Sequence, residues 1–303
     1  MKIWTQWSDL TLPAGMTHLA TDGFLPSEDQ LDQVEFYVPS YMRGIKTLEI
    51  IPKMKNLKVV HYSQAGYEDI LGFTPESVIL CNASGLHDVS TAELTLGLTI
   101  ASRCDLPQIF NNQQRQTWVH KRRTALADSH VGILGHGHIG KRIAGLIQNF
   151  EAKVTSFSQS GSDGAVKVSE FDSYLPSLDV IILILPLTDK THHFFNKKRL
   201  QAMKDGASII NMARGPIIDT EALIEELNTG RIYAALDVTD PEPLPDGHPL
   251  WSAKNLIITP HIGGDSTAFE PRARAMVELQ LARIAQGIGP INQVHGPGFS
   301  PKK

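Results

Sequence analysis

The chain has 303 residues, of which 42% are apolar and 20% charged, and its formal net charge at pH 7 is −4. This length suits two domains of ordinary size, and the composition is typical of a globular protein. The acidic balance argues against a general nucleic-acid binder, which would usually be basic.

The cysteines and the apolar segments indicate a soluble, cytoplasmic protein. Cys81 and Cys104 are too few for a disulfide framework, which fits a reducing compartment. The first ten residues, MKIWTQWSDL, carry acidic and polar residues where a signal peptide needs an apolar stretch. The most apolar run, VIILILPL, is too short to span a bilayer. We therefore expect no membrane partner.

The first ninety residues predict a small α/β unit, with weak strand candidates at residues 35–40, 57–63 and 77–82. A long, mostly apolar helix is expected next. Ser90 and Glu93 form an S-x-x-E capping box that would open this helix. A helix in this place would connect two α/β units.

From residue 131 onward, short apolar runs alternate with amphipathic stretches. The runs are continuously apolar, as expected for parallel strands covered on both faces. They span residues 131–135, 152–157, 180–185, 207–212, 234–238 and 256–260. Helices are expected at 140–150 and 220–230, with Gly230 at a C′ position. This repetition predicts a doubly wound parallel sheet.

The segment 266–287 predicts a second long helix, and a tail rich in glycine and proline follows it. This helix would return the chain to the first domain. We therefore expect residues 1–91 and 285–303 to form a substrate domain, with residues 92–284 inserted as a dinucleotide-binding domain.

A glycine-rich loop, GHGHIG, stands between the first strand and the first helix of the second unit. In this context G-x-G-x-x-G binds a dinucleotide. Gly135 would make the tight turn, Gly137 would let the backbone approach a pyrophosphate, and Gly140 would allow close packing. The cofactor would also contact the remaining loop residues, His136, His138 and Ile139. The two histidines stand near no matching carboxylate or cysteine cluster, so we predict no metal site.

The end of the second strand bears on the choice of cofactor. A carboxylate there would hold the ribose 2′-OH of NAD, but Ser158 and Gln159 occupy the place. Nothing acidic would then repel the 2′-phosphate of NADP, although no arginine follows the strand to hold it. The only nearby cations are Lys167 further on and Lys141 and Arg142 on the helix after the glycine loop. We expect NADP(H) rather than NAD(H). The alternative is that Asp163 turns back and serves NAD.

Three polar residues, Arg214, Glu242 and His261, fall at or just beyond the ends of later strands, where open parallel sheets bind ligands. A guanidinium at the end of a buried strand needs an anion or a path to the surface. Each residue taken alone could be ordinary: a surface salt bridge, a solvated glutamate or a structural histidine. As an ordered set they predict a catalytic site.

These motifs, in this order, resemble the D-isomer-specific 2-hydroxyacid dehydrogenase family from about residue 57 to residue 295. The matching segments are LKVVHYSQAGYEDI, TAEL, GHGHIG, LPLTDKTHHFFN, INMARGPIIDTEAL, ALDVTDPEPLP and TPHIGG. The resemblance includes glyoxylate and hydroxypyruvate reductases and phosphoglycerate dehydrogenases. It implies a Rossmann cofactor domain inserted into a smaller, flavodoxin-like α/β substrate domain. It also implies a homodimer formed through the cofactor domain.

The family's chemistry gives each of the three residues a role. His261 would exchange a proton with the substrate oxygen. Glu242 would orient the imidazole and favour its protonated form. Arg214 would bind the substrate carboxylate and carbonyl, and the Gly-Pro turn after it would let the backbone pass close to the ligand. The implied reaction is hydride transfer between a nicotinamide cofactor and a small 2-oxo acid or D-2-hydroxy acid.

Other positions carry over from the resemblance. The cofactor would also contact Pro186, Thr191, Met212, Ala213, Asp237 and Gly263, together with His261. Asp237 would lie near the nicotinamide amide, and the proline and threonine over the adenosine and ribose. The backbone at Ala65 and Gly66 would hold the substrate carboxylate. Tyr67 stands where the family often has valine, and it is a candidate for narrowing the substrate pocket.

Two other functions stay open. The formate dehydrogenase branch typically has glutamine as the partner of its histidine, so Glu242 speaks against it. The family also resembles corepressors that bind NAD(H), which makes a non-catalytic NAD(P)-binding sensor the second alternative. Arg214, Glu242 and His261 favour an enzyme, and turnover of a reduced cofactor with 2-oxo acids would decide.

Overall fold

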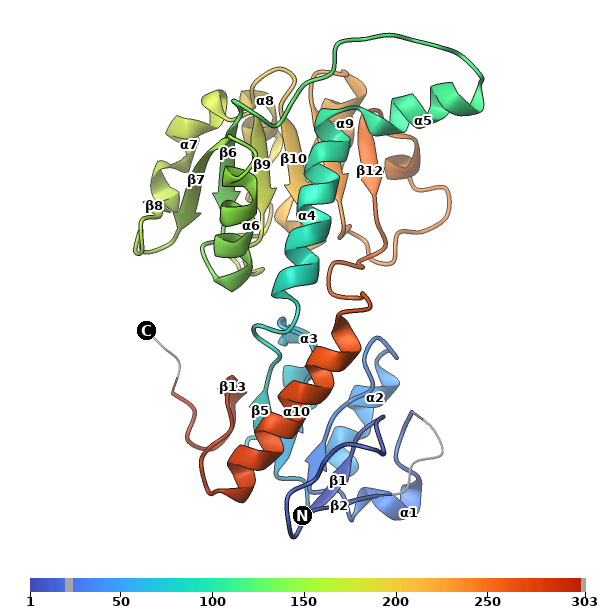
Figure 1. The fold of residues 1–303 in the computed structure, drawn as a ribbon, viewed down its shortest axis with the longest axis vertical. Helices are drawn as coiled ribbons and strands as arrows, with labels where there is room; N and C mark the ends of the chain where they lie inside the picture. The colour runs from blue at the N-terminus through green and yellow to red at the C-terminus, as the bar shows by residue number, and fades with distance from the viewer. Residues whose placement is uncertain (20–23, 301–303) are drawn as a thin grey trace. The chain divides into compact units, whose positions relative to one another are not determined.

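A computed structural model describes residues 1–19 and 24–300 and divides the chain into two compact units (Figure 1). Unit 1 comprises Met1–His87 and Thr267–Lys303, and unit 2 comprises Asp88–Ser266. Each unit is an α/β fold with apolar clusters on both faces of its own sheet.

Unit 2 is built on a seven-stranded parallel sheet in the order β12-β11-β10-β9-β6-β7-β8. The strands are β6 (His130–Leu134), β7 (Lys153–Ser158), β8 (Val166–Lys167), β9 (Val180–Leu183), β10 (Ser208–Asn211), β11 (Tyr233–Leu236) and β12 (Leu256–Ile258). All six strands expected in this part of the chain are confirmed. The two-residue strand β8 was not expected.

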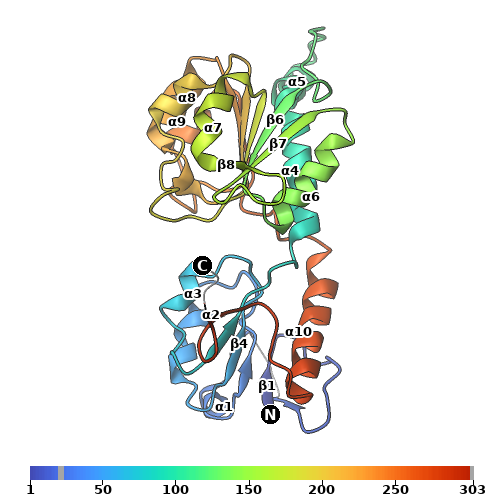
Figure 2. The ribbon, with the colours of Figure 1, turned by 90° about the vertical axis from the view of Figure 1, so that its left-hand side faces the viewer.

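Helices cover both faces of this sheet. They are α4 (Asp88–Arg103), α5 (Leu106–Gln114), α6 (His138–Gln148), α7 (Phe171–Tyr174), α8 (Lys197–Ala202) and α9 (Thr220–Asn228), with 3-10 turns at Val168–Glu170, Leu175–Ser177, Gly215–Ile217 and Pro249–Ser252. Figure 2 shows α4 and α6 on one face and α7, α8 and α9 on the other. Along β9, Ile181 packs with the α7–α9 cluster and Ile182 with the α4–α6 cluster. This two-sided burial explains the continuously apolar strands.

The ends of two helices test the expected capping. In α9, the Asp219 carboxylate accepts a hydrogen bond from the Ala222 N–H at 3.1 Å, and Gly230 has a φ of 79° just beyond the last turn. The C′ glycine is therefore confirmed. The capping box at Ser90 is wrong, because α4 begins at Asp88 and Ser90 lies inside its first turn. The carboxylate of Asp88 is itself favourable at a helix N-terminus.

Unit 1 is built on a six-stranded sheet in the order β13-β5-β4-β3-β1-β2. The strands are β1 (Lys2–Trp4), β2 (Thr17–His18), β3 (Phe36–Tyr37), β4 (Val59–His61), β5 (Ile79–Cys81) and β13 (Gln293–His295). All of these pairings are parallel except that of β13 with β5. The three expected strands are confirmed as β3, β4 and β5, whereas β1, β2 and β13 were not expected.

The helices of unit 1 also lie on both faces of its sheet. They are α1 (Glu28–Leu31), α2 (Lys46–Glu49), α3 (Glu68–Leu71) and α10 (Phe269–Ala285), with a 3-10 turn at Ile51–Lys53. In β1, Ile3 packs with α10, whereas its neighbour Trp4 packs in the cluster that contains Leu48 of α2 and Ile70 of α3.

The observed division of the chain differs from the expected one at α10. Residues up to 284 were expected in the second domain, but the division falls between residues 266 and 267. The reason is the burial of Phe269, Ala273, Val277 and Leu281 of α10, which complete one apolar cluster of unit 1. The first crossing falls between residues 87 and 88 rather than between 91 and 92.

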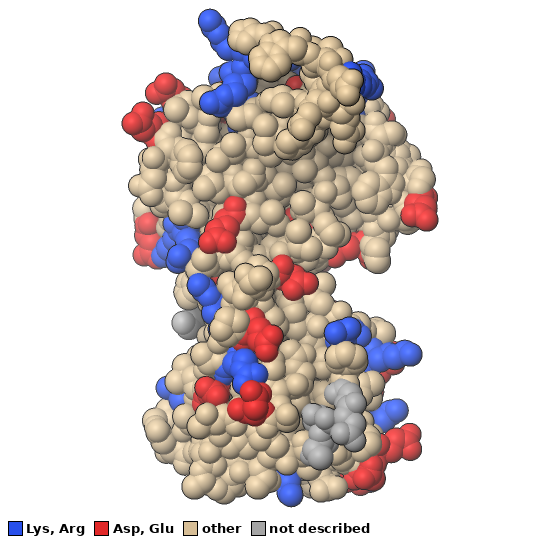
Figure 3. Space-filling model, turned by 45° about the vertical axis from the view of Figure 1, so that its right-hand side comes forward, with Lys and Arg blue, Asp and Glu red and all other residues tan. Residues whose placement is uncertain are grey.

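Two surface properties bear on possible partners. On the face shown in Figure 3, acidic and basic side chains are interspersed over broad uncharged areas, and basic ones gather at the end of unit 2 that carries α5. Across residues 1–19 and 24–300, no helix combines the length and hydropathy that a membrane crossing requires.

Candidate active site

The strand order of unit 2 fixes where a ligand can bind. The chain runs from β6 outward to β7 and β8, then crosses to β9 on the other side of β6. In open parallel sheets the crevice outside the carboxyl ends of the strands at this reversal binds the ligand. The loops after β6, β7, β9, β10, β11 and β12 contain all the polar residues expected to contact the cofactor or the reacting atoms within unit 2.

The three glycines after β6 are required for different reasons. A Cβ on Gly135, whose φ is 119°, would lie 2.2 Å from the Ile184 carbonyl oxygen. A Cβ on Gly140 would lie 2.0 Å from the Gly135 carbonyl oxygen. Packing therefore demands both. A Cβ on Gly137 would meet nothing within 4 Å, so space stays open beside the N-terminus of α6, where a pyrophosphate fits.

The two loop histidines contact acidic residues rather than each other. His136 Nε2 lies 3.0 Å from the Asp163 carbonyl oxygen, and His138 Nδ1 lies 3.7 Å from Asp88 Oδ2. Within the described part of the chain, no three His, Cys, Asp or Glu side chains form a group that could hold a metal ion.

The loop after β7 returns to the glycine loop. Ser158 Oγ, at the end of β7, accepts a hydrogen bond from the Gly161 N–H at 3.0 Å. Further along, Asp163 Oδ2 lies 3.1 Å from Lys141 Nζ on α6, in addition to its contact with His136. Asp163 thus contacts both the glycine loop and α6.

An imidazole and a carboxylate meet at the ends of β11 and β12. His261 Nδ1 lies 2.6 Å from Glu242 Oε1, and the two side chains are 36% and 39% exposed. Burial opposes ionisation of Glu242, but the hydrogen bond and charge of His261, a backbone hydrogen bond from Thr239 and the charge of Arg214 together hold its pKa below 4.5. The carboxylate is therefore ionised near neutral pH, and it accepts a hydrogen bond from the Nδ1–H of His261.

Asp237, which is 3% exposed, holds the backbone around His261. One carboxylate oxygen of Asp237 accepts from Thr259 Oγ1 at 2.5 Å and from the Ile262 N–H at 3.0 Å. The other accepts from the Gly263 N–H at 2.9 Å. His261 itself has a φ of 54°, a left-handed conformation that surrounding contacts must stabilise. In unit 2, Asp237 therefore positions the histidine.

Arg214 leaves β10 at a turn that is fixed on two sides. Asn211 Nδ2 donates to the Arg214 carbonyl at 2.9 Å. A Cβ on Gly215 would lie 2.0 Å from the Thr239 carbonyl oxygen, so the glycine allows the end of β10 to approach the end of β11. The expected approach of this turn to a ligand stays a prediction. The observed close approach is to protein backbone. It brings Arg214 near enough for its charge to lower the pKa of Glu242.

The remaining cofactor candidates also follow strands. After β9, Thr191 Oγ1 donates to the Pro186 carbonyl at 2.8 Å and accepts from the Thr188 N–H at 2.7 Å, which closes the loop on itself. After β10, Met212 and Ala213 are buried. All these candidates lie at strand ends, as expected, and their contacts with a cofactor stay a prediction. Asn211 and Thr239 are positioning residues that sequence reasoning missed.

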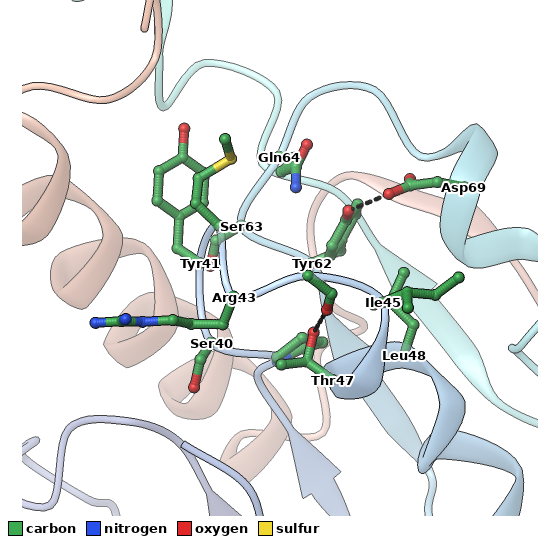
Figure 4. A pocket seen from close by; sticks show the side chains of 13 residues that line it. Ser40, Tyr41, Arg43, Ile45, Thr47, Leu48, Tyr62, Ser63, Gln64 and Asp69 are labelled. Carbon is green, nitrogen blue, oxygen red and sulfur yellow. Dashed lines mark hydrogen bonds between the residues drawn. The ribbon is translucent and has the colours of Figure 1, made fainter. Parts of the chain in front are cut away.

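The residues expected to hold the substrate carboxylate belong to unit 1. Ala65, Gly66 and Tyr67 follow β4, and Asn82 Nδ2 donates to the Ala65 carbonyl at 2.6 Å. Beside them lies a cavity of about 290 Å³, lined by residues 39–45 and 62–64 and by three residues of α2 and α3 (Figure 4). Sequence reasoning missed this cavity, although residues 41–45 directly follow the expected strand at residues 35–40.

The comparisons with known proteins agree with this arrangement. The family profile described as "D-isomer specific 2-hydroxyacid dehydrogenase, NAD binding domain" matches residues 96–263. A Corynebacterium melassecola protein named "uncharacterized protein in proB 3′region" is 37% identical over 76% of this chain and 78% of its own. The hydroxypyruvate reductase of Thermotoga maritima is 34% identical over 80% and 81%. The D-3-phosphoglycerate dehydrogenase of Methanocaldococcus jannaschii is 32% identical over 85% of this chain, which spans about half (51%) of that relative.

Solved structures share the whole architecture. A D-isomer specific 2-hydroxyacid dehydrogenase of Xanthobacter autotrophicus, in complex with NADPH and MES, has a TM-score of 0.73 at 27% identity, covering 87% of this chain and 85% of its own. The D-lactate dehydrogenase of Aquifex aeolicus, complexed with NAD and lactic acid, has a TM-score of 0.77 at 25% identity, covering 94% and 93%. This chain belongs to the D-isomer specific 2-hydroxyacid dehydrogenase family, whose members are nicotinamide-dependent oxidoreductases of 2-hydroxy and 2-oxo acids.

Proposed function

We propose that this protein reduces a small 2-oxo acid to the D-2-hydroxy acid, with His261 as the proton donor. The observation that carries the proposal is the 2.6 Å contact between His261 Nδ1 and Glu242 Oε1. Because this contact occupies Nδ1, Nε2 is the ring nitrogen that remains for a substrate oxygen. The partial exposure of both side chains leaves that nitrogen accessible.

His261, Glu242 and Arg214 each have a separate role in this reaction. A reduced nicotinamide, which the glycine loop and the loops after β9 and β10 would hold, would supply a hydride to the carbonyl carbon. His261 gives its Nε2 proton to the carbonyl oxygen, so that C=O becomes CH–OH. The Glu242 carboxylate accepts a hydrogen bond from Nδ1–H and balances the positive charge that the imidazole carries before this transfer. Arg214 presents two parallel N–H donors to the substrate carboxylate and polarises the carbonyl.

Initial rates with NADH and NADPH test this function. The substrates are glyoxylate, hydroxypyruvate, pyruvate and a bulky 2-oxo acid, and chiral analysis of the product gives its configuration. We expect turnover and a D product. Binding of the cofactor without turnover of any 2-oxo acid would instead favour the sensor function. Oxidation of formate would favour the formate dehydrogenase branch, against which Glu242 argues.

The role of Arg214 is tested by two substitutions. Arg214→Ala removes the donors to the substrate, and we expect kcat/KM to fall by about 10²–10³-fold. Arg214→Lys keeps the positive charge but loses the planar fork, so it should recover only part of this loss. Full recovery by lysine would mean that the charge alone matters.

For the cofactor, we infer a preference for NADP(H). Residues 158–162 contain no carboxylate, and the hydroxyls of Ser160 and Ser162 lie 2.8 Å apart on this loop. A 2′-phosphate is therefore not repelled by the end of β7. Asp163 opposes the preference, because its carboxylate pairs with Lys141 of α6, a cation that could otherwise contact a 2′-phosphate.

Removing the Asp163 carboxylate should sharpen the preference. In Asp163→Asn, Lys141 loses its carboxylate partner and becomes available to a 2′-phosphate, so we expect the ratio of kcat/KM with NADPH to that with NADH to rise by up to about fivefold. Glu170→Gln removes an exposed charge elsewhere in unit 2 and serves as the control. A wild-type protein that uses only NADH would refute the inferred preference.

We further propose a homodimer formed through α5 and the segment that follows it. Ile109, Phe110 and Val119 are about half exposed, and Trp118 is 96% exposed. Figure 1 shows this part of the chain extending away from the rest of unit 2. Large apolar side chains gathered on an extension favour burial against a second copy.

Light scattering after size-exclusion chromatography tests the dimer. Trp118→Ser should shift the protein toward monomer. Trp251→Ser, at an exposed tryptophan on another part of unit 2, should not. A wild-type monomer at micromolar concentration would refute the proposal.

A further inference from the structure

Three threonines stand four residues apart on the buried face of α4: Thr91, Thr95 and Thr99. They lie beside apolar residues of α4 that pack on the sheet of unit 2 (Figure 2). A buried hydroxyl is costly unless it has a hydrogen-bond partner. Thr95 donates to the Thr91 carbonyl at 2.6 Å, and Thr99 donates to the Thr95 carbonyl at 2.7 Å. These two hydroxyls are therefore satisfied within the helix.

The hydroxyl of Thr91 bonds outside the helix. The residue four positions before it, His87, precedes the first residue of α4. Thr91 Oγ1 donates to the carbonyl of Gly263 at 3.2 Å, across 172 positions of the chain. Gly263 stands two residues after His261, and both ends of this bond belong to unit 2. The bond therefore joins the first turn of α4 to the loop that carries the proposed proton donor.

Gly263 is enclosed by three segments of unit 2. Its N–H donates to Asp237 Oδ2, just after β11, and its carbonyl accepts from Thr91. A Cβ on Gly263 would lie 2.9 Å from Asp237 Oδ2, 3.2 Å from Met212 Cε and 3.6 Å from Thr91 Cγ2. The absence of a side chain thus lets this residue fit between the ends of β10 and β11 and the first turn of α4.

The loop of His261 is consequently held from two sides. Asp237 accepts from the N–H groups of residues 261, 262 and 263, through its carbonyl and its carboxylate. Thr91 holds the carbonyl of Gly263 from α4. His261 has a φ of 54°, and a side chain in this conformation keeps its place only where neighbouring contacts fix the backbone.

We propose that Thr91 is a positioning residue, whose hydroxyl holds the loop of His261 so that the imidazole keeps its contact with Glu242. This inference rests on the proposed function, in which His261 donates the proton. Thr91 acts through the loop and not on the substrate. Its loss should therefore slow the reaction and leave the binding of the cofactor unchanged.

Hydrogen–deuterium exchange tests the bond without any measurement of activity. Thr91→Val replaces the hydroxyl by a methyl group, and the amides of residues 261–263 should then exchange about fivefold faster, as the loss of one hydrogen bond allows. Thr95→Val is the matched control, because it removes an equally buried hydroxyl whose partner lies inside α4. Unchanged exchange in Thr91→Val, or the same increase in Thr95→Val, would overturn the proposal.

Kinetics test the consequence for His261. Thr91→Val should lower kcat for a 2-oxo acid by about fivefold, with an unchanged Kd for the reduced cofactor in a fluorescence titration. The decline of the rate at high pH should begin at a lower pH, since a loosely held imidazole loses its anionic partner. Thr91→Ser keeps the hydroxyl and should recover most of kcat. An equal loss in Thr91→Ser, or a loss with an unchanged pH profile, would make Thr91 merely structural and refute the proposal.

The two measurements also separate this inference from the proposed function. If the wild-type protein reduces no 2-oxo acid while Thr91→Val still speeds exchange in the loop, the proposed function fails and the hydrogen bond alone stands. If the wild-type protein is active and His261→Ala inactivates it, but Thr91→Val keeps the wild-type kcat, the positioning role alone is refuted.

Discussion

The strands of the two units differ in how strongly the sequence predicts them. Five strands of unit 2 have four to six residues, and four of these strands, all except β7, are almost wholly buried. The strands of unit 1 have two or three residues. A long, two-sided parallel strand carries a strong local signal, whereas a strand of two residues is defined mainly by distant partners. Local patterns therefore predicted one sheet far better than the other.

The two units also differ in how far their buried polar groups have hydrogen-bond partners. In unit 2, the polar side chains at the strand ends have partners: His261 contacts Glu242, and Asp237 accepts from three donors. In unit 1, the buried Ser63 hydroxyl has no partner among residues 1–19 and 24–300. Four tests probe the two units, from the largest expected effect to the smallest.

Replacing the proton donor should have the largest effect. His261→Ala should lower kcat by about 10²–10⁴-fold, the usual contribution of a general acid. Cofactor affinity, measured by fluorescence titration, should be retained, since the glycine loop is untouched. His120→Ala, at an exposed histidine, is the control. Loss of cofactor affinity would point instead to a disturbed loop around Asp237.

The second substitution tests the assignment of α10 to unit 1. Leu281 is fully buried, whereas Leu279 on the same helix is 49% exposed. We expect Leu281→Ala to lower the free energy of unfolding by about 2–5 kcal/mol and Leu279→Ala to lower it by less than about 0.5 kcal/mol. Urea unfolding measures both. Similar losses in the two variants would contradict the packing of α10 described above.

The third test uses two glycines of one loop. In Gly140→Ala the new Cβ meets backbone at 2.0 Å, and we expect a loss of about 1–3 kcal/mol in stability. Gly137→Ala meets open space at a φ of −77°, so its stability should stay within about 0.5 kcal/mol of wild type. It should instead weaken cofactor binding. Unchanged binding in Gly137→Ala would exclude a pyrophosphate at this position.

The smallest effect concerns pH. The pKa of Glu242 is lowered in the folded protein. The contribution of its ionised carboxylate to folding stability is therefore fully present above pH 4.5, and it is lost as the pH falls through the lowered pKa. The pair is therefore intact at neutral pH. Glu242→Gln removes the anion beside the imidazole, so the decline of the reduction rate at high pH should begin at a lower pH. The pH profile of kcat/KM measures this, and an unchanged profile would make Glu242 purely structural.

Sequence reasoning predicted the strand-end positions of the site because each polar residue directly follows an apolar run. It could not predict the contacts that hold these residues. Asp237 was interpreted as a cofactor contact, and its bonds to residues 259–263 join segments that are distant in sequence. Gly215 was interpreted as an approach to ligand, whereas its close neighbour is the carbonyl of Thr239. Neither contact leaves a local pattern.

The sequence by itself determined the doubly wound sheet, the glycine loop and the order of the polar residues, because these depend on side-chain type and spacing along neighbouring residues. The tertiary structure alone decided that α10 completes unit 1, that Asp163 reaches Lys141, and that Ser63 is buried without a partner. The physical reason is that burial and pairing depend on which distant segments meet. Only the folded chain brings those segments within contact distance.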